Sequence, residues 1–228
     1  MLDGSPDLIS LKNPAPLTPA EPVREKNLTA LLHFGRSGSG YLQSLIDGHP
    51  DISTLPGVYF SGFFGRDVWN HICAGGSGEM VERFCRLYEV LFDARRPEAI
   101  PPAFISDANT NRNFGYQEGF TEMGENRDTP LTLDRATFAN HLEGALKTLD
   151  EVNQRDFFMA IHQAFEKTLG LKSRFPNSVL YHLHAFEPFS MAGFLNYFPD
   201  AKLLMTVRNP VPCCESWALQ SLNNNRNL

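Results

Sequence analysis

A short apolar segment that runs directly into a glycine-rich turn and then into a helical pattern most constrains how this chain can fold. Residues 28–34 (LTALLHF) are almost continuously apolar, which is typical of a strand buried on both faces of a parallel sheet. Glycines follow at once in residues 35–41 (GRSGSGY). Apolar residues then recur at helical spacing from 41 to 46, and residues 48–50 (GHP) end the pattern. The sequence therefore predicts a strand, a tight loop and a helix.

Two further strands of the same buried kind are predicted near the end of the sequence, at residues 178–183 (SVLYHL) and 202–207 (KLLMTV), with a crossover helix at 191–198. Helical periodicity in the middle of the chain covers residues 79–92, 135–149 and 155–169. Because strands alternate with helices, we expect an α/β fold whose mainly parallel sheet is flanked by helices. A ligand is expected at the carboxyl ends of the strands.

The chain of 228 residues is long enough for one substantial core, so we expect one domain at residues 26–228. The preceding residues 1–25 are rich in proline and small polar residues and are predicted to be a flexible tail. Residues 97–130 have no sustained periodicity and are interpreted as a long loop region.

Composition excludes some partners and favours one compartment. A formal net charge of −6 argues against a sequence-independent nucleic-acid binder, which needs a basic face. There is no apolar run long enough to span a membrane, and the first residues do not look like a secretion signal. The four cysteines have no CxxC spacing, and adjacent Cys213 and Cys214 are poorly placed to pair with each other. We therefore expect a reduced, cytoplasmic protein with neither nucleic-acid nor membrane partners.

The turn at residues 35–41 has the chemistry of a phosphate-binding loop. Backbone N–H groups at the start of a helix converge on one point, and the helix dipole adds positive charge there. Glycines allow close approach, serines supply hydroxyl donors, and Arg36 supplies a cation. Neither GxxxxGK[ST] nor GxGxxG is present. Taken alone, the pattern could also be an ordinary glycine-rich turn that binds nothing.

A second anion-binding pattern lies near the C-terminus. Residues 198–210 (FPDAKLLMTVRNP) predict a helix end, a turn and a strand, with Arg208 where the strand stops. Helical periodicity resumes at residues 211–222 and includes Ser216. An arginine at a strand end and a serine on the next helix can bind the same anion. Alone, both could equally be surface residues.

Both patterns resemble the nucleotide-binding elements of the sulfotransferases that use 3′-phosphoadenosine 5′-phosphosulfate (PAPS). Residues 34–52 (FGRSGSGYLQSLIDGHPDI) are similar to the family's 5′-phosphosulfate loop, [KR]-S-G-[ST]-[ST]. Their Arg and their L-[LI]-D-x-H-P ending resemble the branch of protein-tyrosine and many bacterial sulfotransferases. Gly40 departs from the usual Thr or Ser. Residues 198–216 are similar to the 3′-phosphate element, F-P-x-A-K-[FIL], a strand, V-R-[DN]-P and a later serine.

The resemblance implies a P-loop-NTPase-like sulfotransferase fold. It also implies an enzyme that transfers the sulfuryl group of PAPS to a hydroxyl or amine of a small-molecule, carbohydrate or peptide acceptor, by in-line displacement without a metal. The nucleotide-binding residues that it implies are Arg36, Ser37, Gly38, Ser39, Gly40, Tyr41, Arg208 and Ser216. Family members usually continue into a basic, glycine-containing loop, whereas the sequence given stops at Leu228. We therefore expect a domain that lacks the family's C-terminal segment or is given only in part.

The sequence indicates the catalytic base less directly than it indicates the nucleotide-binding residues. Protein-tyrosine sulfotransferases carry a Glu after H-P-[DE]-[VI], but residues 53–57 here (STLPG) have no ionisable side chain. The cytosolic branch places a His at the end of a middle strand, which residues 180–184 (LYHLH) resemble. His184 is therefore the first candidate, His182 the second and Glu187 the third, since an imidazole can take a proton near neutral pH. Both histidines could instead be packing or hydrogen-bonding residues.

Other functions stay open at this point. A small-molecule kinase would need a lysine at the end of the loop, which is absent. A non-catalytic nucleotide-binding module of sulfotransferase ancestry is the second alternative. Residues 97–130 are suited to a polar lid beside the acceptor, but a surface loop without a role fits them equally. The sequence does not indicate an oligomeric state.

Overall fold

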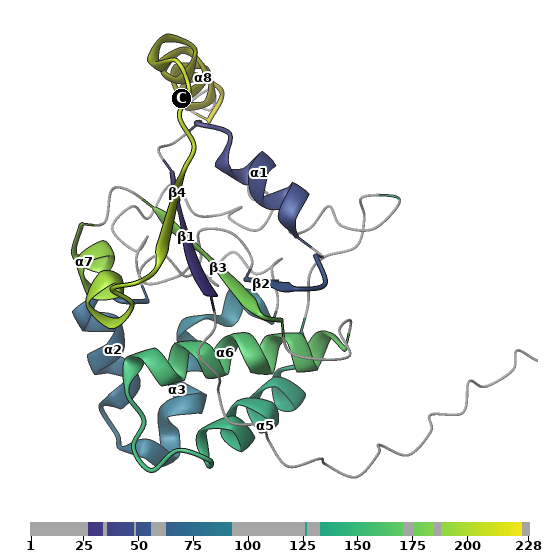
Figure 1. Cartoon of the computed structure of the whole chain (residues 1–228), viewed down its shortest axis with the longest axis vertical. Coiled ribbons are helices and arrows are strands. Elements are labelled where there is room, and N and C mark those ends of the chain that lie inside the picture. Colours follow the sequence, from purple (N-terminus) through teal and green to yellow (C-terminus); the bar gives the residue numbers. More distant parts are fainter. Residues whose placement is uncertain are drawn as a thin grey trace, which may run out of the picture.

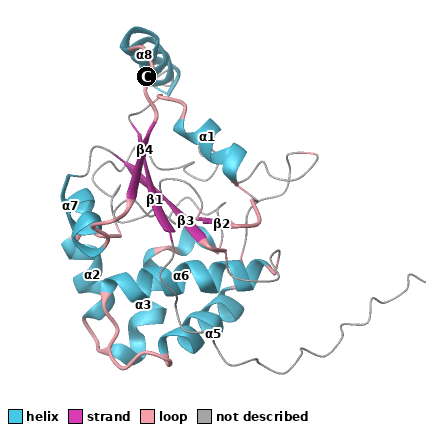
Figure 2. Cartoon of the chain, viewed as in Figure 1, coloured by secondary structure: helices cyan, strands magenta, loops and turns pink. Residues whose placement is uncertain are grey.

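The computed structural model describes residues 27–33, 36–47, 49–55, 63–92, 126, 133–170, 176–184 and 188–224. The predicted tail at residues 1–25 lies outside the described residues. So does the predicted loop at 97–130, apart from Asn126. The described residues form one parallel sheet with helices packed around it, which confirms the predicted α/β arrangement (Figure 2).

Across the sheet the strands follow the order β2 (Ile52–Thr54), β3 (Ser178–His184), β1 (Asn27–His33) and β4 (Lys202–Met205), and all pairings are parallel (Figure 1). The chain leaves β1 towards β2 on one side, and it leaves β3 towards β4 on the other. Connections that run in opposite directions from two neighbouring strands mark the point where open α/β sheets bind ligands, at the carboxyl ends of the strands.

The helices of the described chain are α1 (Ser39–Ile46), α2 (Arg66–Cys73), α3 (Met80–Leu87), α5 (Arg135–Leu146), α6 (Gln154–Leu169), α7 (Pro188–Tyr197) and α8 (Pro210–Asn224), with short 3₁₀ turns at Ser77–Glu79 and Glu89–Leu91. Figure 1 shows α2, α3, α5 and α6 together at one end of the molecule and α8 at the opposite end. The start of α6 is set by Asn153, whose side chain accepts the Asp156 N–H at 2.9 Å. The helix ends at Gly170, which has the left-handed conformation that favours glycine (φ 65°).

An aromatic core holds the helices against one face of the sheet. The Phe158 ring on α6 is fully buried and lies 5.1 Å from the ring of Phe64 and 5.2 Å from that of Tyr181 on β3. Tyr181 in turn packs 5.1 Å from Phe194 on α7. Tilted and edge-to-face rings at these distances add to the stabilisation from apolar burial, so strand β3 is fixed to two helices at once.

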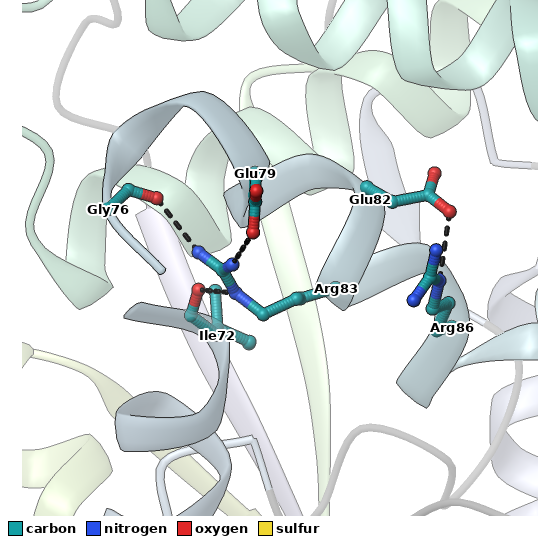
Figure 3. A network of polar contacts seen from close by, with 6 residues as sticks. All are labelled: Ile72, Gly76, Glu79, Glu82, Arg83 and Arg86. Carbon is teal, nitrogen blue, oxygen red and sulfur yellow. Dashed lines mark hydrogen bonds and ion pairs between the residues drawn. The ribbon is translucent and has the colours of Figure 1, made fainter. Parts of the chain in front are cut away.

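A partly buried arginine, Arg83, holds the turn between α2 and α3. Arg83 donates from Nε to the Ile72 carbonyl and from Nη2 to the Gly76 carbonyl, both at 2.8 Å, and it pairs with Glu79 (Figure 3). Its side chain is only 13% exposed. Two of the three contacts satisfy carbonyls at and just after the end of α2 that would otherwise be left to water, so Arg83 has a structural role.

Three details differ from the sequence-based predictions. Residues 202–207 were predicted to form a buried strand, but β4 is exposed along its length, with Leu203 at 52%. The reason is its place at the edge of the described sheet, where its described strand partner is β1 alone. The predicted helix at 79–92 is interrupted at Tyr88, and the sequence predicted neither β2 nor α2.

Candidate functional site

The glycine-rich loop turns sharply between β1 and α1. Arg36 has φ 66°, and Gly38, the N-cap of α1, has φ 93°. A side chain at position 38 would meet no atom within 4 Å, so the turn requires glycine there for its backbone conformation and not for space. The left-handed conformation of Arg36 is unfavourable for a residue with a side chain and persists only where neighbours hold it.

The first turn of α1 presents backbone donors next to this loop. The Leu42 N–H makes the first hydrogen bond of the helix, to the Gly38 carbonyl at 3.0 Å. The N–H groups of residues 39–41 precede that bond and have no carbonyl one turn earlier in the helix. Because the N-cap is glycine, no N-cap side chain can occupy them. Their position at a helix N-terminus favours a negatively charged ligand.

The segment that follows β4 lies against this loop. The pairing of the two strands continues past β4, where the Thr206 N–H donates to the Leu32 carbonyl at 3.4 Å. The hydroxyls of Ser37 and Thr206 are 2.8 Å apart, although 169 positions separate them in the sequence. The two predicted anion-binding patterns are therefore neighbours at the carboxyl end of the sheet.

Arg208 and the first turn of α8 also contact the glycine-rich loop. Arg208 Nη1 lies 3.4 Å from the Arg36 carbonyl oxygen, and Cys213 Sγ lies 3.4 Å from the same oxygen. Asn209 caps α8, because its Oδ1 accepts the Val211 N–H at 3.0 Å. Sequence reasoning missed Thr206 and Cys213, since their roles depend on which strands become neighbours.

Ser216 lies three residues after Cys213 on α8 and is partly exposed. Residues three apart on a helix lie on the same side of it. Ser216 is therefore one turn further from the loop than Cys213 and on the same side of α8. The structure thus brings six of the predicted nucleotide-binding residues into one loop and helix start, with Arg208 beside them and Ser216 one turn away.

Two of the three candidate bases, His184 and His182, belong to β3. His184 is the last residue of that strand, and its register partner is His33, the last residue of β1. His182 is paired with Leu31, further inside the sheet, and is only 6% exposed. Sequence reasoning missed His33, because only the strand register reveals its place beside His184. Glu187 lies outside the described residues.

An open hollow of about 690 Å³ elsewhere in the molecule shares no residue with this site. Residues from the start of α3, the end of α5 and the turn before α6 line it, among them Met80, Glu143 and Val152. Within the described part of the chain, none of the helices has the length and apolar character needed to cross a membrane.

Comparisons with protein-family models, with curated proteins and with solved structures found no match to this chain.

Proposed function

We propose that this chain is a sulfotransferase that moves the sulfuryl group of PAPS to a hydroxyl or amine acceptor. One observation supports this most: the Ser37 and Thr206 hydroxyls are 2.8 Å apart, and Arg208 lies 3.4 Å from the Arg36 carbonyl oxygen. The segments that resemble the 5′-phosphosulfate loop and the 3′-phosphate element therefore meet, as binding of one nucleotide with both groups requires. The parallel sheet and the loop after β1 also support a P-loop-NTPase-like sulfotransferase fold.

Each phosphate has its own donors in this proposal. The N–H groups of residues 37–41 and the hydroxyls of Ser37 and Ser39 hold the 5′ end of the nucleotide. Arg208 and Ser216 bind the 3′-phosphate, which is the group that distinguishes PAPS from ATP. Arg208 is exposed and its guanidinium lies next to the loop, which makes it available to such a ligand.

PAPS supplies an activated sulfuryl group when it is bound. In the transfer the acceptor oxygen or nitrogen forms a bond to sulfur while the bond from sulfur to the 5′-phosphate oxygen breaks, and adenosine 3′,5′-bisphosphate leaves. Negative charge grows on that leaving oxygen, and Arg36 with the start of α1 stabilises it. Positioning and electrostatics of this kind need no metal ion, so the proposed reaction is metal-independent.

The proton of the acceptor goes to a base at the carboxyl end of β3. His184 is the first choice, because it ends the strand next to the β1 loop. His182 is the second choice, and its burial inside the sheet makes it less accessible to an acceptor. Glu187 is the third. A neutral imidazole is a suitable base near pH 7.

We place the protein in the cytoplasm, with a small-molecule, carbohydrate or peptide acceptor. All four cysteines are free, which suits a reducing compartment.

The test is sulfuryl transfer from ³⁵S-labelled PAPS to a panel of hydroxyl and amine acceptors. Arg36→Ala should lower kcat by about 10²-fold, the usual cost of losing one group that stabilises transition-state charge, while nucleotide affinity changes less. Arg36→Lys should keep part of the activity, because the charge remains. Arg86→Gln is the matched control, since Arg86 is an exposed arginine on α3 that pairs with Glu82 at 2.9 Å.

The same assays also distinguish a sulfotransferase from the two alternative functions, a non-catalytic nucleotide-binding module and a kinase. Tight binding of adenosine 3′,5′-bisphosphate without transfer to any acceptor would favour a non-catalytic nucleotide-binding module. Transfer of phosphate from ATP would favour a kinase. Full activity in Arg36→Ala would remove Arg36 from the mechanism.

A further inference from the structure

Cys213 contacts the glycine-rich loop from the first turn of α8. Its Sγ lies 3.4 Å from the Arg36 carbonyl oxygen, where the thiol is the donor, and its own N–H donates to the Asn209 carbonyl at 3.4 Å. We propose that Cys213 is a positioning residue that sets the orientation of the peptide group between Arg36 and Ser37. The functional meaning of this role rests on the proposed use of the loop as a phosphate site.

The argument follows from the geometry of a peptide group. In a planar trans peptide, the C=O and the N–H point in opposite directions. The oxygen of Arg36 is held towards α8, so the N–H of Ser37 in the same peptide points away from α8. If this peptide rotated, it would present an oxygen in place of a donor, and an oxygen repels a phosphate. Fixing the Arg36 oxygen therefore fixes a donor of the loop.

Arg36 needs this support because of its backbone conformation. Among the described residues, it is the one residue other than glycine with a positive φ, at 66°. Such a conformation is maintained only when surrounding contacts determine it. The donors on its carbonyl are the Cys213 thiol and Arg208 Nη1, both 3.4 Å away.

The Cys213 thiol and the Arg208 guanidinium have different roles when a ligand is present. Arg208 is the proposed partner of the 3′-phosphate, and its guanidinium must turn towards that group. Cys213 belongs to the first turn of α8, where its N–H donates to the Asn209 carbonyl, and it can stay on the Arg36 oxygen. The loop thus keeps its shape while Arg208 binds the nucleotide.

Hydrogen exchange of the free chain tests this role without any nucleotide. We would compare the exchange of residues 36–46 in the wild type with that in Cys213→Ala, Cys213→Ser and Cys214→Ala. Losing one weak donor should speed exchange at the loop and the start of α1 by roughly two- to tenfold in Cys213→Ala. Cys213→Ser keeps a donor on the same carbon and should restore part of the protection. Cys214 is the exposed neighbour, and its substitution should leave exchange unchanged.

A second readout is the affinity for adenosine 3′,5′-bisphosphate, which should weaken in Cys213→Ala and recover partly in Cys213→Ser. Urea unfolding should not change, because Cys213 is not part of the buried core. Wild-type exchange rates in Cys213→Ala, or equal acceleration in Cys214→Ala, would overturn the inference. If the exchange results are as expected but the wild type does not bind the bisphosphate, the proposed function fails and the positioning role stands.

Discussion

The aromatic core is buried, whereas the segment formed by β4 and α8 is largely exposed. In the core, Phe158 is fully buried and packs against the rings of Phe63 before α2, Tyr181 on β3 and Phe198 just after α7. On α8, Trp217 is 66% exposed, and the side chains of β4 are exposed as well. Yet the proposed contacts with the 3′-phosphate, Arg208 and Ser216, come from the exposed segment or follow directly from it. Stability and ligand binding should therefore respond to different substitutions.

The largest expected effect is on stability, and it separates the two regions. Phe158→Ala leaves a cavity among packed rings and should lower the free energy of unfolding by about 3–5 kcal/mol. Leu219→Ala removes an exposed side chain of α8 and should change it by less than about 0.5 kcal/mol. Urea unfolding followed by circular dichroism measures both. Similar losses in the two variants would mean that α8 is part of the cooperative core.

Thiol reactivity also distinguishes the buried region from the exposed α8, because each of the two contains two cysteines. Burial raises the pKa of Cys85 on α3 to about 12 and also raises the pKa of Cys73 on α2, where Arg83 opposes the shift. For Cys85 the rise from 9.0 lowers the reactive thiolate fraction roughly a thousandfold. A short iodoacetamide pulse should label exposed Cys214 first and Cys85 only after unfolding in urea. Early labelling of Cys85 in the native protein would show that the core opens easily.

A smaller effect concerns His141 on α5, whose Nδ1 lies 3.2 Å from the Thr168 hydroxyl. Burial, and secondly the positive charge of Lys167, lower its pKa below the ordinary value of 6.5. The unfolded chain therefore takes up a proton at a pH where the folded chain does not, and stability falls as the pH drops below about 6.5. His141→Asn should flatten the dependence of unfolding free energy on pH between 7 and 5. An unchanged slope would assign the acid sensitivity to other groups.

The sequence predicted the central strands and the loop well, because their signals are local. Residues 28–34 and 178–183 are mostly apolar, and the structure has β1 (Asn27–His33) and β3 (Ser178–His184) there. Strand β2 was missed because Ser53 is polar, and its burial depends on a hydrogen bond of 2.9 Å with His162, which lies 109 positions away. Nor could the exposure of β4 be predicted, since an apolar run does not tell an edge strand from a central one.

The same limit applies to the candidate site. The resemblance of two local patterns predicted Arg36 and Arg208, but their contact depends on β1 and β4 becoming neighbours. His33 beside His184 and Cys213 beside Arg36 likewise follow from register and packing, and no sequence spacing indicates them.

In the proposed function, the β1 loop and the segment after β4 together bind a nucleotide with a 3′-phosphate. Calorimetric titration with adenosine 3′,5′-bisphosphate and with adenosine 5′-monophosphate tests it most directly, in the wild type, in Arg208→Gln and in the control Arg86→Gln. One charged hydrogen bond should make the wild type and the control prefer the bisphosphate by roughly 10- to 150-fold, and Arg208→Gln should lose that preference. Equal wild-type affinity for the two nucleotides, or binding of neither, would show that these two segments do not form a 3′-phosphate site.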